Sequence, residues 1–373
     1  MMKLVEQIED SRKEIKTDSY PMSIGEITNL YRDGDLVIFP EYQRYFRWTR
    51  KQKSEFIESL ILDIPIPPIF VSNNADGRWD IIDGLQRTST ILEFMGLLRK
   101  RDNDAEFYEP SVLLGTKFLP NLEGKKWDDE DDLANSLPAE VRRNIKRRKI
   151  NISIVDSTVN PNIKYELFQR LNRNGSILKG QEVRNSLMIM INNRFYKFIE
   201  KLSSYERFIE IIDISDKKKD EQFQKELIVR FLILLETEGE NINPQDDMES
   251  YLTEEIINIS ETFNNERYTE IEEKFDQTCN LLQEVFGEGT FKKYYKSNNK
   301  FKGQFFLGLF EAIFVPVYIN YDFYKDNQED LKEKVKGISD NSDFKASTKH
   351  GIRALDRMKK VFELGKETFY EHR

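Results

Sequence analysis

The chain has 373 residues, of which 33% are charged and 39% hydrophobic, as is typical of a soluble globular protein with two or three domains. One cysteine, Cys279, excludes an internal disulfide and a cysteine-based zinc site, and two histidines, His350 and His372, exclude a histidine-rich metal centre. Apolar runs are shorter than the ~18 residues of a membrane span, and residues 1–14 are too charged for a signal peptide. We therefore expect a cytoplasmic protein with no membrane partner.

The net charge of -9 is unevenly distributed. Acidic and basic residues balance over residues 1–200, so residues 201–373 carry the whole excess of acidic groups. An acidic surface repels phosphates, and we expect any nucleic acid to contact the first half of the chain. An acidic run at 128–132 and a basic run at 142–149 interrupt this half. The basic run is either a solvated helix face or a phosphate-contacting patch.

Alternating helix and strand signals fill the first half of the chain. Ser23 and Glu26 have capping-box spacing, which predicts a helix from there to Gly34. Apolar periodicity and proline positions then predict the following order: a strand at 36–39, a helix at 52–62, an extended segment at 64–68 leading into a strand at 69–71, a strand at 79–82, a helix at 86–101, a strand at 150–155 and a helix at 160–172.

From about residue 180 nearly every segment has helical periodicity. The predicted helices cover 181–202, 223–235, 266–286, 304–319 and 344–364. The sequence thus predicts an α+β protein with a small mixed sheet in an N-terminal α/β domain, residues 15–186, followed by an all-helical domain, residues 187–373. Cys279 falls in one of the late helices, where core packing is its expected role.

The sequence WDIIDGLQRTST at 79–90 is the strongest candidate site. A strand ends at Asp83, Gly84 allows a tight turn, and a helix with Arg87 in its first turn follows. Free N–H groups and the positive end of the helix dipole bind anions, and Thr88, Ser89 and Thr90 add hydroxyl donors. Asp83 is a candidate to hold a metal ion or position a water. The alternative is structural: Asp83 caps the helix and Arg87 pairs with a surface carboxylate.

Two further stretches place arginines beside aromatic residues or glycine. PEYQRYFRW at 40–48 contains Arg44 and Arg47, which could stack on a base or bind a phosphate, or could lie at the edge of a core. FQRLNRNGSILKGQEVRN at 168–185 contains Asn172 and Arg184 at a break between two helices, with an ordinary capped turn as the alternative. Together the three stretches could clamp a polyphosphate. The chain has no P-loop and no kinase motif.

Four blocks follow one another along the chain in the order typical of one family: PEYQRYFRW at 40–48, IPIPPIF at 64–70, WDIIDGLQRTST at 79–90 and FQRLNRNGSILKGQEVRN at 168–185. The region from about 20 to 190 resembles the N-terminal domain of GmrSD-type modification-dependent restriction enzymes, which is marked by a D-G-Q-Q-R motif. The resemblance implies a ParB/sulfiredoxin-like core and a function in nucleotide-linked antiviral DNA defence.

The resemblance assigns Asp83, Gly84, Gln86 and Arg87 to a nucleoside triphosphate, with Arg44 and Arg47 as neighbours. The expected cofactors are GTP, ATP or CTP with Mg²⁺. Asp83, Gln86 and Arg87 are the candidate catalytic residues, and Arg44, Arg47, Gly84, Thr88, Asn172 and Arg184 are the candidate nucleotide-binding residues. Leu85 replaces the first glutamine of the motif, so binding is the firmer expectation and hydrolysis stays open.

Full-length restriction members of this family carry a nuclease domain of the His-Asn-His kind. Neither His350 nor His372 lies in such a motif. The sequence therefore favours a regulatory, nucleotide-binding component, with DNA and a separate nuclease or methyltransferase subunit as candidate partners. Two alternatives remain: a ParB-like nuclease in which Asp83 and Glu182 share a metal ion, and a non-catalytic adaptor that uses residues 142–149 to contact DNA or a partner.

Overall fold

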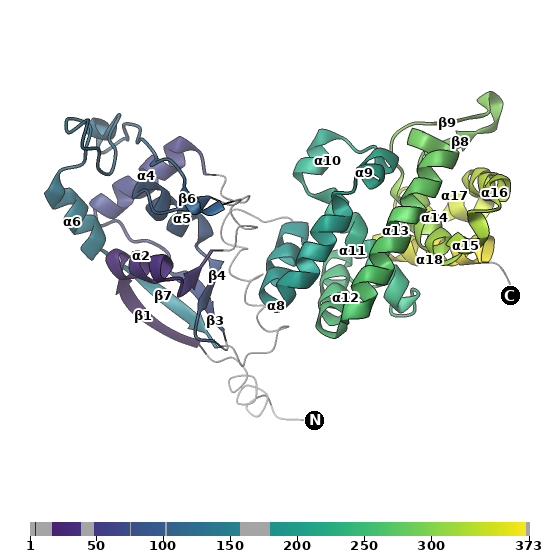
Figure 1. Ribbon diagram of the computed structural model, residues 1–373, viewed down its shortest axis with the longest axis horizontal. Helices are drawn as coiled ribbons and strands as arrows, with labels where there is room; N and C mark the ends of the chain where they lie inside the picture. Colours follow the sequence, from purple (N-terminus) through teal and green to yellow (C-terminus); the bar gives the residue numbers. More distant parts are fainter. Residues whose placement is uncertain are drawn as a thin grey trace. The chain divides into compact units, whose positions relative to one another are not determined.

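The computed structural model describes residues 4, 17–38, 48–74, 76–100, 103–156 and 180–370. The chain divides into two compact units, an N-terminal unit of residues 1–177 and a helical unit of residues 178–373 (Figure 1). The predicted class is confirmed: the N-terminal unit is mixed α/β with a small mixed sheet, and the second unit is mostly helical.

A five-stranded sheet with the order β1-β7-β3-β4-β2 organises the N-terminal unit. Strand β1 is antiparallel to β7, β3 is parallel to β7 and antiparallel to β4, and β2 is parallel to β4. A separate hairpin joins β5 to β6. The elements of the unit are β1 (Thr17–Ser23), α2 (Ile24–Asp33), β2 (Leu36–Val37), α4 (Arg50–Ile61), β3 (Ile69–Asn73), β4 (Trp79–Asp83), α5 (Leu85–Phe94), β5 (Arg99–Lys100), β6 (Asn103–Phe107), α6 (Ala139–Arg147) and β7 (Lys149–Val155).

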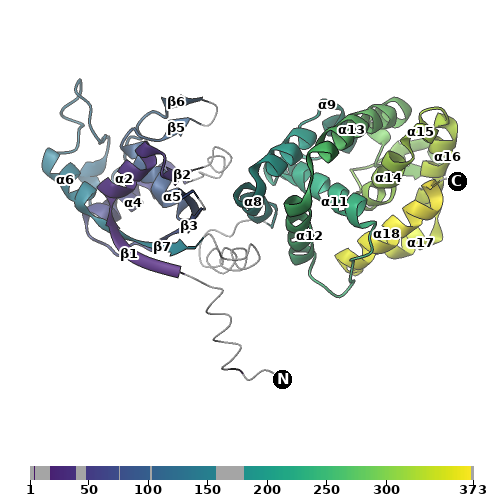
Figure 2. The same cartoon turned by 60° about the horizontal axis from the view of Figure 1, so that its bottom comes forward.

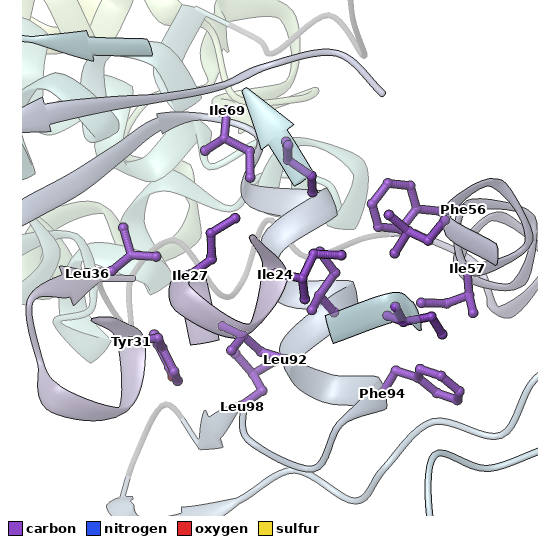
Figure 3. Packing of buried hydrophobic residues seen from close by; sticks show 14 of the residues in the cluster. Ile24, Ile27, Tyr31, Leu36, Phe56, Ile57, Ile69, Leu92, Phe94 and Leu98 are labelled. Carbon is purple, nitrogen blue, oxygen red and sulfur yellow. The ribbon is translucent and has the colours of Figure 1, made fainter. Parts of the chain in front are cut away.

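Helices α2, α4 and α5 pack their apolar sides into one core with the sheet, as Figure 3 shows for Ile27, Phe56, Ile69 and Leu92. The side chain of Ser23 accepts a hydrogen bond from the Glu26 N–H at 3.1 Å, which starts α2 where its capping spacing predicts. The predicted helix at 86–101 is wrong over its last seven residues. Helix α5 ends at Phe94 because Gly96 adopts φ +70° and turns the chain into β5.

The helical unit is built on pairs of packed helices, among them α14 with α18, α8 with α11 and α12, and α9 with α13 (Figure 2). Its helices are α8 (Gly180–Ser203), α9 (Glu206–Ile212), α10 (Asp216–Asp220), α11 (Phe223–Thr237), α12 (Met248–Thr262), α13 (Asn265–Phe286), α14 (Leu307–Ile319), α15 (Tyr321–Tyr324), α16 (Gln328–Asp340), α17 (Ser342–Ser347) and α18 (Ala354–Phe369).

Two predictions for the helical unit are wrong in part. The helix expected at 344–364 is two helices, α17 and α18, separated by a turn in which Gly351 has φ +90°. The unit also contains an antiparallel hairpin of β8 (Lys293–Tyr295) and β9 (Lys300–Lys302), so it is not all helical. Helix α8 begins at Gly180, ahead of the domain boundary expected at 186/187. Cys279 is fully buried in α13, as expected, and burial raises the pKa of its thiol.

Candidate functional site

The turn between β4 and α5 has the strand–glycine–helix geometry that the sequence predicts. Gly84 adopts φ +99°, and a Cβ at this position would lie 2.9 Å from the Ile69 Cγ1 atom, so only glycine fits. Within the described residues no side chain caps the N-terminus of α5. The first N–H groups of the helix therefore keep the capacity to bind an anion.

Arg87 forms an ion pair with Asp83 across one turn, with 2.8 Å between Nη2 and Oδ2. Its Nη1 atom also donates to the Pro67 carbonyl at 2.8 Å. The structural alternative holds in one half and fails in the other. Arg87 does pair with a carboxylate, but that carboxylate is Asp83, which does not cap α5. The two contacts use two of the five guanidinium N–H groups, and the Asp83 side chain is 29% exposed. The Asp83 carboxylate can therefore accept a further partner, whereas the Arg87 side chain is only 12% exposed and offers its remaining N–H groups over a small surface.

Two buried hydroxyls follow in the same helix. Thr88 and Ser89 are fully buried, and neither side-chain oxygen has a hydrogen-bond partner among the described residues. The Thr90 hydroxyl instead donates to the Gln86 carbonyl at 2.7 Å. A buried hydroxyl without a partner costs roughly 1–3 kcal/mol and is uncommon in folded proteins. The first turns of α5 thus hold hydroxyl groups that have no partner among the described residues, as well as charge.

Gln86 connects the turn to the aromatic and arginine-rich stretch. Its Oε1 atom accepts a hydrogen bond from the Trp48 backbone N–H at 3.1 Å. Strand β2 runs parallel to β4, so both strands end at the edge of the sheet where Asp83 lies. Arg44 and Arg47 lie outside the described residues. Strand β2 ends at Val37, opposite Asp80, and Trp48 contacts Gln86. The position of Arg44 and Arg47 beside the turn stays a prediction.

Of the third predicted stretch, the structure describes residues 180–185. Asn172 lies outside the described residues, whereas Arg184 is fully buried in α8 of the helical unit. Its Nη1 atom lies 2.6 Å from Glu249 Oε2, and its Nη2 atom lies 3.4 Å from Glu226 Oε2. Two carboxylates thus already compensate the charge of Arg184. Its assignment to the nucleotide stays a prediction.

Arg184 begins a chain of alternating charges through the helical unit. Glu226 on α11 also pairs with Arg230 at 2.7 Å, and Arg230 pairs with Glu311 on α14 at 2.8 Å. Glu311 is fully buried and also accepts from Arg357 of α18, with 3.2 Å between Oε2 and Nε. Sequence reasoning did not select Glu226, Arg230 or Glu311. Their occurrence inside otherwise apolar helices was the signal that could have identified them.

The carboxyl group of Glu226 gives this chain a predicted pH dependence. Burial alone would raise its pKa, but Arg230 and Arg184 outweigh burial and hold the pKa below the ordinary value of 4.5. The ionised form therefore stabilises the folded chain. This contribution is complete above about pH 4.5, the unfolded-state value, and is lost as the pH falls through the lower folded-state pKa.

We expect Glu226→Gln to lower the free energy of unfolding more at pH 7 than at pH 3, as measured by urea denaturation followed by circular dichroism. The matched control is Glu333→Gln, which removes an exposed carboxylate paired with Lys336 at 2.6 Å on α16. An equal effect of Glu226→Gln at both pH values would contradict the prediction.

The two charged runs of the first half partly neutralise each other. Arg142 of α6 pairs with Asp128 of the acidic run, and Arg148 pairs with Asp63. Arg143, Arg147 and Lys149 are exposed. Exposed side chains fit both interpretations of the basic run, a solvated face and a phosphate-contacting patch, so the choice between them stays open. Arg142 and Arg148 are held in ion pairs.

Metal ligands do not gather at the site as the structure describes it. No group of three or more histidine, cysteine, aspartate or glutamate side chains in the described ranges is placed to hold a metal ion. Glu182, the proposed second ligand beside Asp83, is buried in α8 of the helical unit. His350 is exposed, and His372 lies outside the described residues. None of the helices in these ranges is long and apolar enough to cross a membrane.

The fold and the turn together define a mixed α/β domain with an arginine and an aspartate at an uncapped helix N-terminus. Residues 24–189 match the model of the family described as GmrSD restriction endonuclease, N-terminal domain. The match covers less than half of the chain and confirms the resemblance to that family seen in the sequence. Searches of curated proteins and of solved structures gave no significant match.

Proposed function

We propose that the protein is a restriction-type defence protein that binds a nucleoside triphosphate, with Mg²⁺, at the β4–α5 turn. The family of residues 24–189 supports the defence setting. The main support for nucleotide binding is the Asp83–Arg87 pair. It lies at a helix N-terminus that no side chain caps in the described residues.

The residues of the turn fit a magnesium-bound polyphosphate. The free donors of Arg87 and the first N–H groups of α5 are suited to phosphate oxygens. The partly exposed carboxylate of Asp83 is a hard oxygen ligand of the kind that Mg²⁺ prefers, alone or through water. A magnesium-bound polyphosphate offers phosphate oxygens to Arg87 and a cation to Asp83. Each member of the ion pair would therefore gain a new partner if the ligand separated them.

Titration of the purified chain with GTP, ATP and CTP in the presence of Mg²⁺ tests the proposal. We expect one of them to bind and Arg87→Ala to weaken binding by tenfold or more, since a charge-assisted hydrogen bond contributes roughly 1.5–3 kcal/mol. The control is Arg78→Ala, which breaks an exposed pair with Asp76 at 2.6 Å between β3 and β4. Binding by none of the three nucleotides, or equal losses in both variants, would refute the proposal.

Hydrolysis is the second part of the proposal and is measured separately as phosphate release. Asp83 and Gln86 are the residues proposed to act on the attacking water or the metal, so Asp83→Asn and Gln86→Ala should lower turnover more than they lower affinity. No observation in the described residues favours the nuclease alternative. Cleavage of plasmid DNA that disappears in Asp83→Asn would revive it.

A further inference from the structure

The most basic stretch of the helical unit is the β8–β9 hairpin with its flanks. Residues 289–310 contain five lysines and no acidic residue, in the half of the chain that carries the acidic excess. Lys292 pairs with Asp213 at 2.6 Å. Lys293, Lys300 and Lys302 have no carboxylate partner among the described residues. In Figure 1 the hairpin extends past the ends of the neighbouring helices.

The pairing of the hairpin places like charges together. Lys293 lies directly opposite Lys302, and Tyr295 lies directly opposite Lys300. Since paired residues share a face and alternate residues return to it, these four side chains lie on one face of the hairpin. Directly opposed lysines repel each other and destabilise a hairpin. A bound anion would remove this repulsion.

The other face of the hairpin is aromatic and anchors it to the helical unit. The rings of Tyr294 and Phe301 lie 5.2 Å apart, and Phe301 packs against Phe286 at the end of α13. The Tyr294 N–H donates to the Ser339 hydroxyl of α16 at 3.2 Å. The basic face is therefore held in place by the packing of the opposite face.

A cavity of about 330 Å³ extends the basic face toward α17, and Lys293, Lys296, Lys345 and Thr348 are among the residues that line it. One carboxylate, Asp340, forms ion pairs with two of these lysines, Lys296 at 2.9 Å and Lys345 at 3.2 Å. Cationic donors therefore outnumber carboxylates around the cavity. Tyr295, which is 47% exposed, adds a hydroxyl donor beside them.

We propose that the basic face of the β8–β9 hairpin binds the phosphate backbone of duplex DNA. Rows of lysines and tyrosine hydroxyls are suited to phosphate oxygens, and a two-stranded ribbon fits the major groove of DNA. The choice of DNA as the polyanion rests on the proposed restriction-type function. The acidic average of residues 201–373 does not prevent such binding, because charges beyond about 8 Å are screened at physiological salt.

Anisotropy of a labelled duplex, measured over a series of salt concentrations, tests the hairpin. The variant carries Lys293→Gln, Lys300→Gln and Lys302→Gln. Each lysine that contacts a phosphate contributes about one unit to the dependence of log affinity on log salt, so we expect that slope to fall by roughly three. At low salt the affinity should fall by roughly tenfold or more. Thermal melting should show the variant to be at least as stable as the parent chain, because the repulsion between Lys293 and Lys302 is removed.

The control variant removes the same charge elsewhere in the unit, with Lys325→Gln, Lys332→Gln and Lys360→Gln. These exposed lysines pair with Asp322, Glu329 and Asp356. An equal loss of DNA binding in both triple variants, or an unchanged salt slope in the hairpin variant, overturns the proposal. Competition by polyglutamate as strong as that by unlabelled duplex also overturns it, since it indicates an acidic protein partner.

Nucleotide titration of the same preparations separates this inference from the proposed function. The hairpin variant should bind nucleotide as the parent chain does. The Arg87→Ala variant should retain hairpin-dependent DNA binding when no nucleotide is added. An unchanged salt slope in the hairpin variant therefore refutes the DNA-binding face. Failure of the parent chain to bind any nucleotide refutes the function proposed for the β4–α5 turn.

Discussion

Replacing Glu311 with glutamine is expected to lower the free energy of unfolding by about 3–5 kcal/mol, the range measured when one partner of a buried ion pair is removed. Glu311 is fully buried and is shared by Arg230 and Arg357. Glutamine keeps the shape but removes the charge, so Glu226 is the one carboxylate among the described residues that still pairs with the buried Arg230. The loss is mainly the cost of leaving that charge incompletely paired.

Urea denaturation followed by far-ultraviolet circular dichroism reports on the helical unit. All three tryptophans, at positions 48, 79 and 127, lie in the N-terminal unit, so their fluorescence reports on that unit in the same experiment. The double variant Glu311→Leu with Arg230→Met should recover part of the loss, because both charges leave the core together. A loss below about 1 kcal/mol for Glu311→Gln would show that the pair is not buried as described.

Gly365→Ala should produce a loss of similar size, about 3 kcal/mol, at the upper end of the usual range for overpacking. A Cβ at Gly365 on α18 would lie 2.0 Å from the Ala312 carbonyl oxygen and 2.9 Å from its carbonyl carbon on α14. These are backbone atoms, so no side-chain rotation relieves the clash. The two helices must therefore move apart, which weakens their packing.

Gly337→Ala is the matched control on α16. A Cβ at Gly337 meets no atom within 4 Å, so alanine should raise the free energy of unfolding by about 0.5–1 kcal/mol through its higher helix propensity. Thermal and urea denaturation of both variants compare the same substitution in a tight and an open setting. Equal effects at the two positions would contradict the close packing of α14 against α18.

Local signals in the sequence were sufficient for much of the N-terminal unit. The capping residue Ser23 and the left-handed Gly34 delimit α2, and the predicted strand–Asp83–Gly84–helix pattern matches the observed turn between β4 and α5. Such features depend on a few neighbouring residues, so they can be read from the chain alone. The class of the fold and the family followed from the same blocks.

Features that depend on distant residues could not be predicted in this way. The partner of Arg87 is Asp83, which lies within the same motif, but the partners of Arg184 lie 42 and 65 positions away on α11 and α12. No local pattern reveals that such an arginine is buried. The β8–β9 hairpin was missed because its strands have three residues each, too few to show a period of two.

The start of α8 has a practical consequence for dissecting the protein. The family match extends to residue 189, whereas the helical unit begins at 178, so the last stretch of the matched region is the first turns of α8. A fragment that stops at 189 would expose Arg184, Leu187 and Met188, which are buried in the intact chain. The complementary fragment would leave Glu226 and Glu249 without Arg184. Fragments divided near residue 177 should be more soluble and more stable than fragments divided at 189, because the buried residues of α8 then stay with the helical unit.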